Sequence, residues 1–370
     1  MPHTQKLSTA ITLMGVTMVT TTPRWATAPT ASAGFWVANY TEERKQQWDA
    51  FVATASNATF LFCRDYMDYH RERFADHSLM VFHGTELKAV LPANLRSDNV
   101  VVSHEGLTYG GLVVRPDVKL EDVLACLYWA LRHLVEEGIA SLIYKRIPSF
   151  YALRPDDDVA YGLFLLQALL CRRDCAQVIP LPASLPFQKR RKRRINKARA
   201  FGLHLVQESR FLPFWEQVLE PRLASRYGVK PVHSAREISQ LAAHFPQSIK
   251  QFSVYDGLGI LAGVTIYETS TVAHTQYIAA SDAGRAIGAL DFLLDWLIHD
   301  RYQDKKFFDL GICNENDGRA LNFGLLEWKE SFGARTFSHE FYEVSTLAFA
   351  RLEPALRPPD RLRNGADQSH

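Results

Sequence analysis

The chain has 370 residues, 47% apolar and 22% charged, which excludes both a disordered chain and one built from long uncharged membrane runs. At roughly 100 to 200 residues per domain, this length predicts about two domains. The 42 basic and 40 acidic side chains leave a net charge of +2, so any function that depends on positive charge must be local.

The first 35 residues differ from the rest of the chain in being rich in Thr and Ala. An apolar stretch over Leu7–Val19 and the segment Ala31–Ala33 imitate a secretory signal. Polar residues interrupt the apolar stretch, which favours a disordered leader or a misplaced start over a signal. Beyond this segment there is no run of 18 or more apolar residues, so no membrane span is expected.

The first domain is predicted over residues 36–180. Amphipathic spacing indicates a helix over Thr41–Ala55, and two short apolar runs, Leu79–Phe82 and Leu87–Leu91, flank a glycine-containing turn and indicate a hairpin. Leucines at helical spacing predict a longer helix over Leu120–Glu137, ended by Gly138. This domain is therefore predicted to pack a helix on a sheet.

The segment 181–201 is predicted to be a linker followed by a basic helix. Prolines between Pro180 and Pro186 break the periodicity, and Lys189–Arg199 then holds eight cationic residues among eleven. This run could bind nucleic acid or anionic lipid without specificity, or it could be a solvated helix that links two domains.

The second domain is predicted over residues 202–350, before a tail over residues 351–370. Strands are expected over Gln251–Asp256, Ile260–Glu268 and Thr271–Ala280, a helix over Ala286–Arg301 and a strand over Lys306–Ile312. Both halves are thus expected to be α+β units, each a mostly antiparallel sheet flanked by helices.

Five cysteines show neither paired spacing nor the Cys/His spacing of zinc sites, so neither a disulfide nor a metal is expected. Cys171 and Cys175 could share a helix face, but buried, reduced cysteine in a cytoplasmic protein is the expected state. The five are Cys63, Cys126, Cys171, Cys175 and Cys313.

A candidate anion site lies between Ala279 and Leu290, where a glycine-containing segment follows a strand and opens a helix. Backbone N–H groups at a helix start can hold a phosphate, and Arg285 would add a charged contact. The alternative is an ordinary turn with a solvated arginine.

This segment resembles the acetyl-CoA motif of the GNAT superfamily, Arg/Gln-x-x-Gly-x-Gly/Ala, with Arg285, Gly288 and Leu290 at the three motif positions. Leu290 departs from the small final residue. The resemblance implies tandem GNAT-like domains and an acyl-CoA along Thr271–Ala280. The cofactor-binding residues would be Tyr277, Ile278, Ala279, Arg285, Gly288, Ala289, Asn322 and Lys329.

A closer likeness is to the FemAB-like branch of double-GNAT proteins. It is carried by the phrases Arg64–His70, Arg73–Leu79, Ser103–Gly111, Val272–Ala280, Phe308–Glu315, Gly318–Asn322 and Trp328–Arg335. Among such proteins the chain is most similar to bacterial N-acyltransferases of nucleotide-linked amino sugars, which act in surface polysaccharide and O-antigen synthesis. The resemblance therefore implies small-molecule substrates, a cytoplasmic location and no nucleic acid.

Amide formation needs an uncharged amine and a donor that polarises the thioester carbonyl. By strand alternation His274 and Gln276 are expected to share a face that meets substrate, opposite Tyr277, although His274 could equally be a core histidine. Asp309, on the following strand, could supply a base or an orienting group.

In the first domain, Ser103, Glu105 and Tyr109 are expected to bind sugar or nucleotide hydroxyls. His104 and His77 are candidate general bases, and a structural role in a turn is the alternative. The FemAB-like resemblance adds a third interpretation of the basic run, in which Arg193 and Lys197 hold a diphosphate at the domain cleft.

Two rival functions remain. The resemblance also admits a FemAB-like transferase that uses aminoacyl-tRNA and a cell-wall precursor. A different class is a nonenzymatic protein that binds nucleic acid or membrane through Lys189–Arg199.

Overall fold

The structure is a computed structural model, and it describes residues 34–154, 157–182 and 185–356. Most of the expected leader and of the expected tail lie outside these residues. The described residues form one eleven-stranded sheet, one four-stranded sheet and one two-stranded sheet, with helices on their faces.

The secondary structure elements have the following bounds. The strands are β1 (Phe35–Asn39), β2 (Ala75–Asp76), β3 (Leu79–His83), β4 (Glu86–Leu91), β5 (Asn94–Leu95), β6 (Val100–Val102), β7 (Val113–Val114), β8 (Ser141–Lys145), β9 (Leu169–Pro180), β10 (His204–Glu208), β11 (Ile249–Tyr255), β12 (Ile260–Glu268), β13 (Val272–Ala280), β14 (Phe307–Ile312), β15 (Asn314–Glu315), β16 (Ala320–Leu321) and β17 (Arg335–Ser345). The α-helices are α1 (Lys45–Thr54), α2 (Arg64–Met67), α3 (Leu120–Glu136), α4 (Asp157–Leu165), α5 (Lys189–Arg199), α6 (Leu212–Phe214), α7 (Glu220–Tyr227), α8 (Ala235–His244), α9 (Asp282–Ile287), α10 (Ala289–Trp296) and α11 (Phe323–Glu330). The other helical turns are η1 (Glu42–Arg44), η2 (Phe60–Phe62), η3 (Asp68–His70), η4 (Ser149–Tyr151), η5 (Trp215–Leu219), η6 (Leu297–Arg301) and η7 (Thr346–Ala355).

The largest sheet runs through both halves of the molecule, in the order β10-β11-β12-β13-β14-β9-β17-β8-β6-β5-β2. Its pairs are antiparallel except β13 with β14 and β6 with β8. The expected α+β class, with mostly antiparallel sheets flanked by helices, is confirmed.

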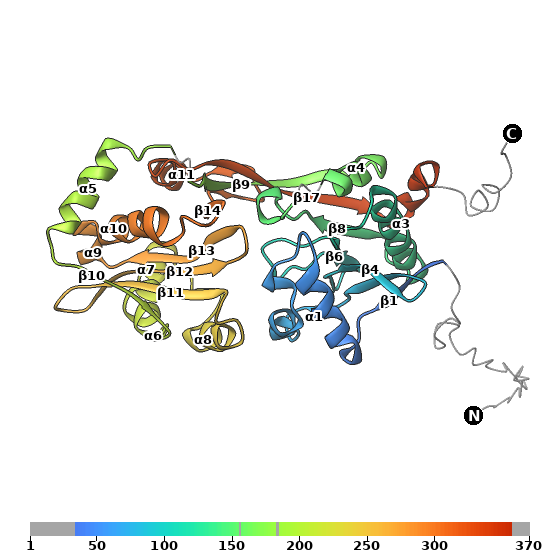
Figure 1. Cartoon of the computed structure of the whole chain (residues 1–370), viewed down its shortest axis with the longest axis horizontal. Helices are drawn as coiled ribbons and strands as arrows, with labels where there is room; N and C mark the ends of the chain where they lie inside the picture. Colours follow the sequence, from blue (N-terminus) through green and yellow to red (C-terminus); the bar gives the residue numbers. More distant parts are fainter. Residues whose placement is uncertain (1–33, 155–156, 183–184, 357–370) are drawn as a thin grey trace, which may run out of the picture.

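Two long strands, β9 and β17, join the halves (Figure 1). β9 pairs with β14 near its end, and β17 pairs with β9 along most of its length before its last residues pair with β8. The chain therefore crosses between the halves twice, and η7, which follows β17, packs on α3 of the first half.

The elements predicted in the first half are confirmed. The expected first helix is η1 followed by α1, the hairpin is β3 with β4, and the long helix is α3. Gly138 ends α3 in a left-handed conformation with φ of 77°, which glycine adopts without a steric penalty.

In the second half, the hairpin of β11 and β12 and the strands β13 and β14 are also confirmed. The helix expected over Ala286–Arg301 was wrong at its start. It begins earlier, at Asp282, because the Ser281 hydroxyl caps it by accepting a hydrogen bond from the Gly284 N–H at 3.1 Å. Gly288, with φ of 86°, then divides the segment into α9 and α10.

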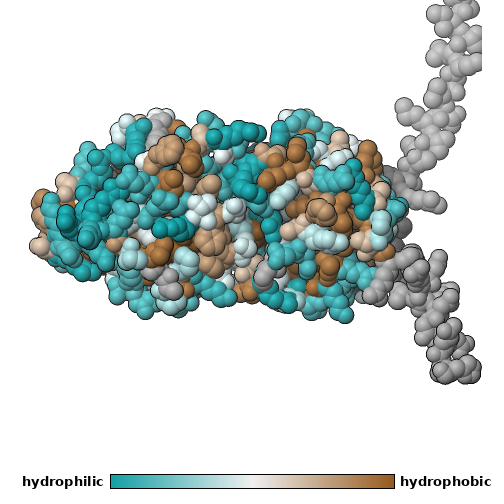
Figure 2. All heavy atoms as spheres, turned by 90° about the horizontal axis from the view of Figure 1, so that it is seen from above, coloured by the Kyte–Doolittle hydropathy of each residue, from teal (hydrophilic) through white to brown (hydrophobic). Residues whose placement is uncertain are grey.

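The surface differs between the ends of the molecule. Figure 2 shows mainly hydrophilic residues over the end that carries α5, where seven of the cationic side chains belong to exposed residues. In the part of the chain that the structure describes, no helix has the length and apolar character needed to cross a membrane.

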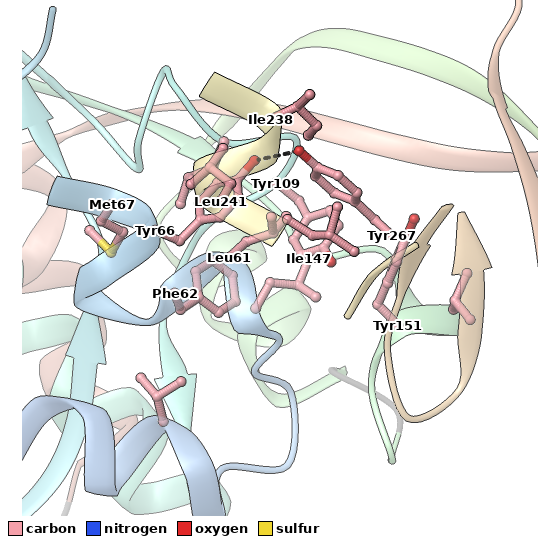
Figure 3. Packing of buried hydrophobic residues seen from close by; sticks show 14 of the residues in the cluster. Leu61, Phe62, Tyr66, Met67, Tyr109, Ile147, Tyr151, Ile238, Leu241 and Tyr267 are labelled. Carbon is pink, nitrogen blue, oxygen red and sulfur yellow. Dashed lines mark hydrogen bonds between the residues drawn. The ribbon is translucent and has the colours of Figure 1, made fainter. Parts of the chain in front are cut away.

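Three hydrophobic cores hold these elements. One lies in the first half beneath α3, and one in the second half beneath α10. The third lies between the halves and contains Trp215 of the second half. It also contains Tyr66 and Tyr109 from the first half and Tyr267 from the second (Figure 3). The hydroxyls of Tyr66 and Tyr267 are 3.3 Å apart, so a hydrogen bond also joins the two halves inside this core.

Candidate functional site

The central strands β13 and β14 separate partway along their length. They pair in parallel through Val272 with Phe307, Ala273 with Phe308 and His274 with Asp309. Beyond this point β14 pairs with β9, while β13 continues to Ala280 with β12 as its partner. Within the described residues, the β14-facing edge of β13 after His274 therefore has no strand partner, and an extended ligand could bind there.

A β-bulge interrupts β13 at this place. Thr265 of β12 lies opposite Tyr277 and Ile266 lies opposite Thr275, so Gln276 is the extra residue. Because the bulge shifts the alternation by one position, His274 and Tyr277 lie on the same face of β13. The prediction that His274 and Gln276 share a face opposite Tyr277 is therefore wrong.

The face of β13 with His274 and Tyr277 borders the core that contains side chains of both halves. Tyr277 packs in the core between the halves, and its ring centroid is 5.0 Å from that of Trp215. Ile278 and Ala280 lie on the other face, with the core beneath α10.

His274 and Asp309 contact each other where β13 and β14 separate. The His274 Nδ1 lies 2.8 Å from a carboxylate oxygen of Asp309. Asp309 also accepts hydrogen bonds from the Tyr151 hydroxyl at 2.8 Å and from the Gly311 N–H at 2.7 Å. The His274 side chain keeps 13% exposure, whereas that of Asp309 has none.

The carboxyl group of Asp309 stays ionised in this environment. Its complete burial raises its pKa, but the charge and hydrogen bond of His274, with contributions from His339 and the Gly311 N–H, outweigh that effect and lower the pKa to about 2. Burial lowers the pKa of His339 to about 4, so this second histidine is neutral near pH 7. A carboxylate of this kind fixes the orientation and the tautomer of its histidine partner.

Lys329 of α11 supports the end of β14. Its ammonium donates hydrogen bonds to the carbonyls of Gly311, at 2.9 Å, and Ile312, at 2.6 Å. Burial lowers its pKa to about 8. Asn322, expected near the cofactor, caps α11 by accepting a hydrogen bond from the Leu325 N–H at 3.0 Å.

A pocket of about 840 Å³ opens where β13 ends and α9 begins. Its volume is in the range that holds a small molecule or cofactor. The pocket contains Ile278, Ala279, Arg285 and Gly288 of the predicted cofactor residues. Its lining residues are Arg190, Arg191, Arg194, Leu219, Arg222, Leu223, Arg226, Ile278, Ala279, Ala280, Asp282, Gly284, Arg285, Ala286, Gly288, Leu290, Asp291, Gly324, Leu325, Glu327 and Trp328.

The basic helix α5 forms one wall of this pocket. Arg191 is buried and pairs with Asp291 of α10, and Arg194 also pairs with Asp291, at 2.7 Å. Arg190 and Arg194 face the pocket. Arg193 and Lys197, predicted to hold a diphosphate, are exposed and are absent from the described lining of the pocket.

The predicted residues of the first half lie in other hydrogen-bond networks. His77 pairs with Glu137 at 2.8 Å, Glu105 with Asn94 at 3.0 Å, and the Ser103 hydroxyl accepts from the Lys145 N–H at 2.7 Å. His104 is 2% exposed, and burial lowers its pKa to about 3. No hydrogen bond or ring contact in the described part of the chain joins His77 or His104 to His274.

Tyr109 reaches the site indirectly, since its ring centroid is 4.5 Å from that of Tyr151, which bonds Asp309. Sequence reasoning missed Tyr151 and also missed Thr275, whose buried hydroxyl has no hydrogen-bond partner in the described structure. Tyr151 is 158 residues from Asp309 and carries no local signal. Thr275 could have been noticed in the sequence, because it is a polar residue within the apolar pattern of β13.

No group of three or more His, Cys, Asp or Glu side chains in the described residues could hold a metal ion. No family model and no curated protein matches the chain. Several solved structures share its fold over nearly their full length. FemX is 14% identical with a TM-score of 0.59, and the match covers 85% of this chain and 99% of FemX.

Two further solved structures share the fold. The C-terminal domain of a putative lysylphosphatidylglycerol synthetase from Agrobacterium fabrum is 12% identical with a TM-score of 0.53, and the match covers 85% of this chain and 96% of that domain. L-PGS from Bacillus licheniformis is 12% identical with a TM-score of 0.51, with 86% and 98% of the two chains covered. These likenesses concern the fold alone, and they agree with the α+β class expected from the sequence.

Proposed function

We propose that the chain is an acyltransferase that takes an acyl group from a phosphate-bearing donor in the pocket at the end of β13 and transfers it to an amine beside His274. The observation that carries this proposal is the His274–Asp309 pair at the point where β13 and β14 separate. Ile278, in the pocket, is four residues further along β13, or about 13 Å at the rise of an extended strand. An extended donor arm along the unpaired edge of β13 spans that distance.

His274 is the general base in this proposal. Its Nδ1–H donates to Asp309, which leaves Nε2 to accept a proton from the amine nitrogen as that nitrogen bonds to the acyl carbon. The C–S bond of the thioester then breaks, and the sulfur takes up a proton and leaves as the free thiol. His104 is a poor base, because burial lowers its pKa to about 3. Thr275 lies on the opposite face of β13 from His274, and its hydroxyl has no hydrogen-bond partner in the described structure. This hydroxyl is a candidate donor to the thioester carbonyl.

We further propose acyl-CoA as the donor and a nucleotide-linked amino sugar as the acceptor. The arginines of the pocket and the free N–H groups at the start of α10 suit the diphosphate of coenzyme A. The sugar acceptor rests on the sequence resemblance. It would approach from the side of the sheet that His274 faces.

The second candidate is aminoacyl transfer from a charged tRNA. The fold shared with FemX and with a lysylphosphatidylglycerol synthetase domain favours it. A nonenzymatic binding protein is less well supported, because Arg191, Arg194 and Arg199 of the basic helix pair with carboxylates of α10.

Donor binding is tested first. Acetyl-CoA and longer acyl-CoAs should raise the melting temperature of the full chain, and Arg285→Ala should reduce that shift. Arg236→Ala, in α8 outside the pocket, is the matched control. An unchanged melting temperature at saturating acyl-CoA would show that acyl-CoA is not the donor.

Turnover is then followed as free thiol released from acyl-CoA with a panel of nucleotide-linked amino sugars. Release with one of these acceptors, abolished by His274→Ala, is the expected result. If no acceptor in the panel gave thiol release and aminoacyl-tRNA gave product, aminoacyl transfer would become the favoured function.

A further inference from the structure

The donor pocket has arginines on two walls. Arg190 and Arg194 come from α5, and Arg285 comes from α9; these helices lie with α10 on one face of the second-half sheet. Arg222 and Arg226 come from α7, which lies on the other face (Figure 1). The pocket therefore presents positive charge from two directions, with the end of β13 between them.

The arginines of the first wall already have carboxylate neighbours. Arg190 pairs with Glu327 at 2.8 Å, Arg194 with Asp291 at 2.7 Å, and Arg285 with Asp282 at 3.3 Å. Arg222 differs from them. Although half-buried, it has no ion pair with any carboxylate of the described residues.

Arg222 and Arg226 lie on α7, which continues directly from η5. They are four residues apart, one turn of α7, so both side chains leave the same face of the helix. Leu219 and Leu223 accompany them in the pocket lining, and η5, which runs directly into α7, packs on β12 and β13. Two guanidinium groups on one turn suit the oxygens of a phosphate monoester.

We propose that Arg222 and Arg226 form a second phosphate subsite, which binds a monoester phosphate on the nucleotide end of the donor, apart from the diphosphate at the start of α10. This inference rests on the proposed acyl-CoA donor. Coenzyme A carries such a group as its ribose 3′-phosphate, and dephospho-CoA lacks it. The α7 wall therefore selects donors with a 3′-phosphorylated nucleotide.

The test compares the dissociation constants of CoA and dephospho-CoA by calorimetry on the full chain. The wild type should bind CoA about ten-fold more tightly or better, as expected for charge-assisted hydrogen bonds to phosphate. In the double variant Arg222→Ala/Arg226→Ala the two constants should become nearly equal, because only CoA loses affinity. Arg236→Ala should keep the wild-type ratio.

Unchanged affinity for dephospho-CoA in the double variant also shows that the pocket remains folded. A wild-type protein that binds both compounds equally well overturns the subsite and leaves the acyl-CoA donor standing. A double variant that retains the wild-type ratio overturns it too. If neither compound binds the wild type, the donor proposal itself fails, and the subsite fails with it.

Discussion

The hydrogen bond between His274 and Asp309 lies where β13 and β14 separate. It orients the His274 ring and helps to keep the Asp309 carboxylate ionised. Asp309 is fully buried and receives hydrogen bonds from Tyr151 and Gly311 as well as from His274. Since all three partners donate to it, a group at this position must be an acceptor. The residue type at 309 therefore decides which nitrogen of His274 carries the proton.

We expect Asp309→Asn to lower kcat by about 10² to 10⁴, the range seen when a general base loses its orienting carboxylate. The amide would place a donor among three donors and favour the wrong imidazole tautomer. Thiol release gives kcat, and calorimetry with CoA should show unchanged donor binding. Tyr151→Phe, which removes one donor only, should cost much less. A loss of donor affinity that accounts for the whole effect would contradict this role.

Four buried histidines make stability depend on pH. Burial lowers the pKa of His70, His233 and His339 to about 4 and that of His104 to about 3, from an ordinary 6.5. The unfolded chain therefore binds more protons than the folded chain below pH 6.5. Stability is full above that pH and falls as the pH drops toward 4.

At pH 5, a histidine such as His339 should cost about 2 kcal/mol of unfolding free energy relative to pH 7.5. Urea unfolding at the two pH values measures the change. The substitution His339→Phe keeps a ring in the core and should flatten the pH dependence, whereas His244→Phe, at an exposed histidine, should not. Equal slopes in all three proteins would exclude the buried rings as the cause.

At the scale of elements, the pocket depends on how α9 begins. The carbonyl of Leu261 in β12 accepts hydrogen bonds from the N–H and the hydroxyl of Ser281, at 2.9 and 3.1 Å. Gly284 lies against the same carbonyl, and a Cβ on Gly284 would be 2.1 Å from its oxygen. The helix can dock on β12 only because residue 284 has no side chain.

We therefore expect Gly284→Ala to displace α9, to lower the unfolding free energy by about 1 to 3 kcal/mol through overpacking, and to weaken CoA binding. Thermal melting and calorimetry measure the two effects. Gly257→Ala, at a position where a Cβ meets no atom within 4 Å, should change neither. If the Gly284→Ala variant bound CoA as tightly as the wild type, the position of α9 would not matter for CoA binding.

Elements with local signals could be predicted from the sequence, and those that depend on distant pairing could not. The hairpin of β3 and β4 and the helix α3 carry their turn and stop residues beside them, whereas the pairing of β9 with β17 joins segments about 160 residues apart. In the candidate site, the strands that carry His274 and Asp309 could be predicted because their apolar patterns are clear, while the roles of the two residues stay predictions. The bulge at Gln276 was missed, because a bulge is defined by the register with β12 rather than by residue type.

At the scale of the whole molecule, the two halves share too much structure to be independent. The main sheet passes from one half to the other through β9 and β17, and the third core contains side chains of both. Opening one half would expose that shared core and leave the edges of both long strands unpaired. The His274–Asp309 pair depends on both halves, since Tyr151 of the first half donates to Asp309 of the second.

We therefore expect the halves to unfold together. Leu131→Ala in the core of the first half and Leu293→Ala in that of the second should each cost about 2 to 5 kcal/mol, because both side chains are fully buried. Hydrogen exchange under native conditions should show the slowest amides of β3 and of β12 losing the same protection in either variant. Leu347→Ala, at a residue that is 70% exposed, should leave both unchanged. Loss of protection confined to the half that carries the substitution would show that β9, β17 and the shared core do not couple the halves.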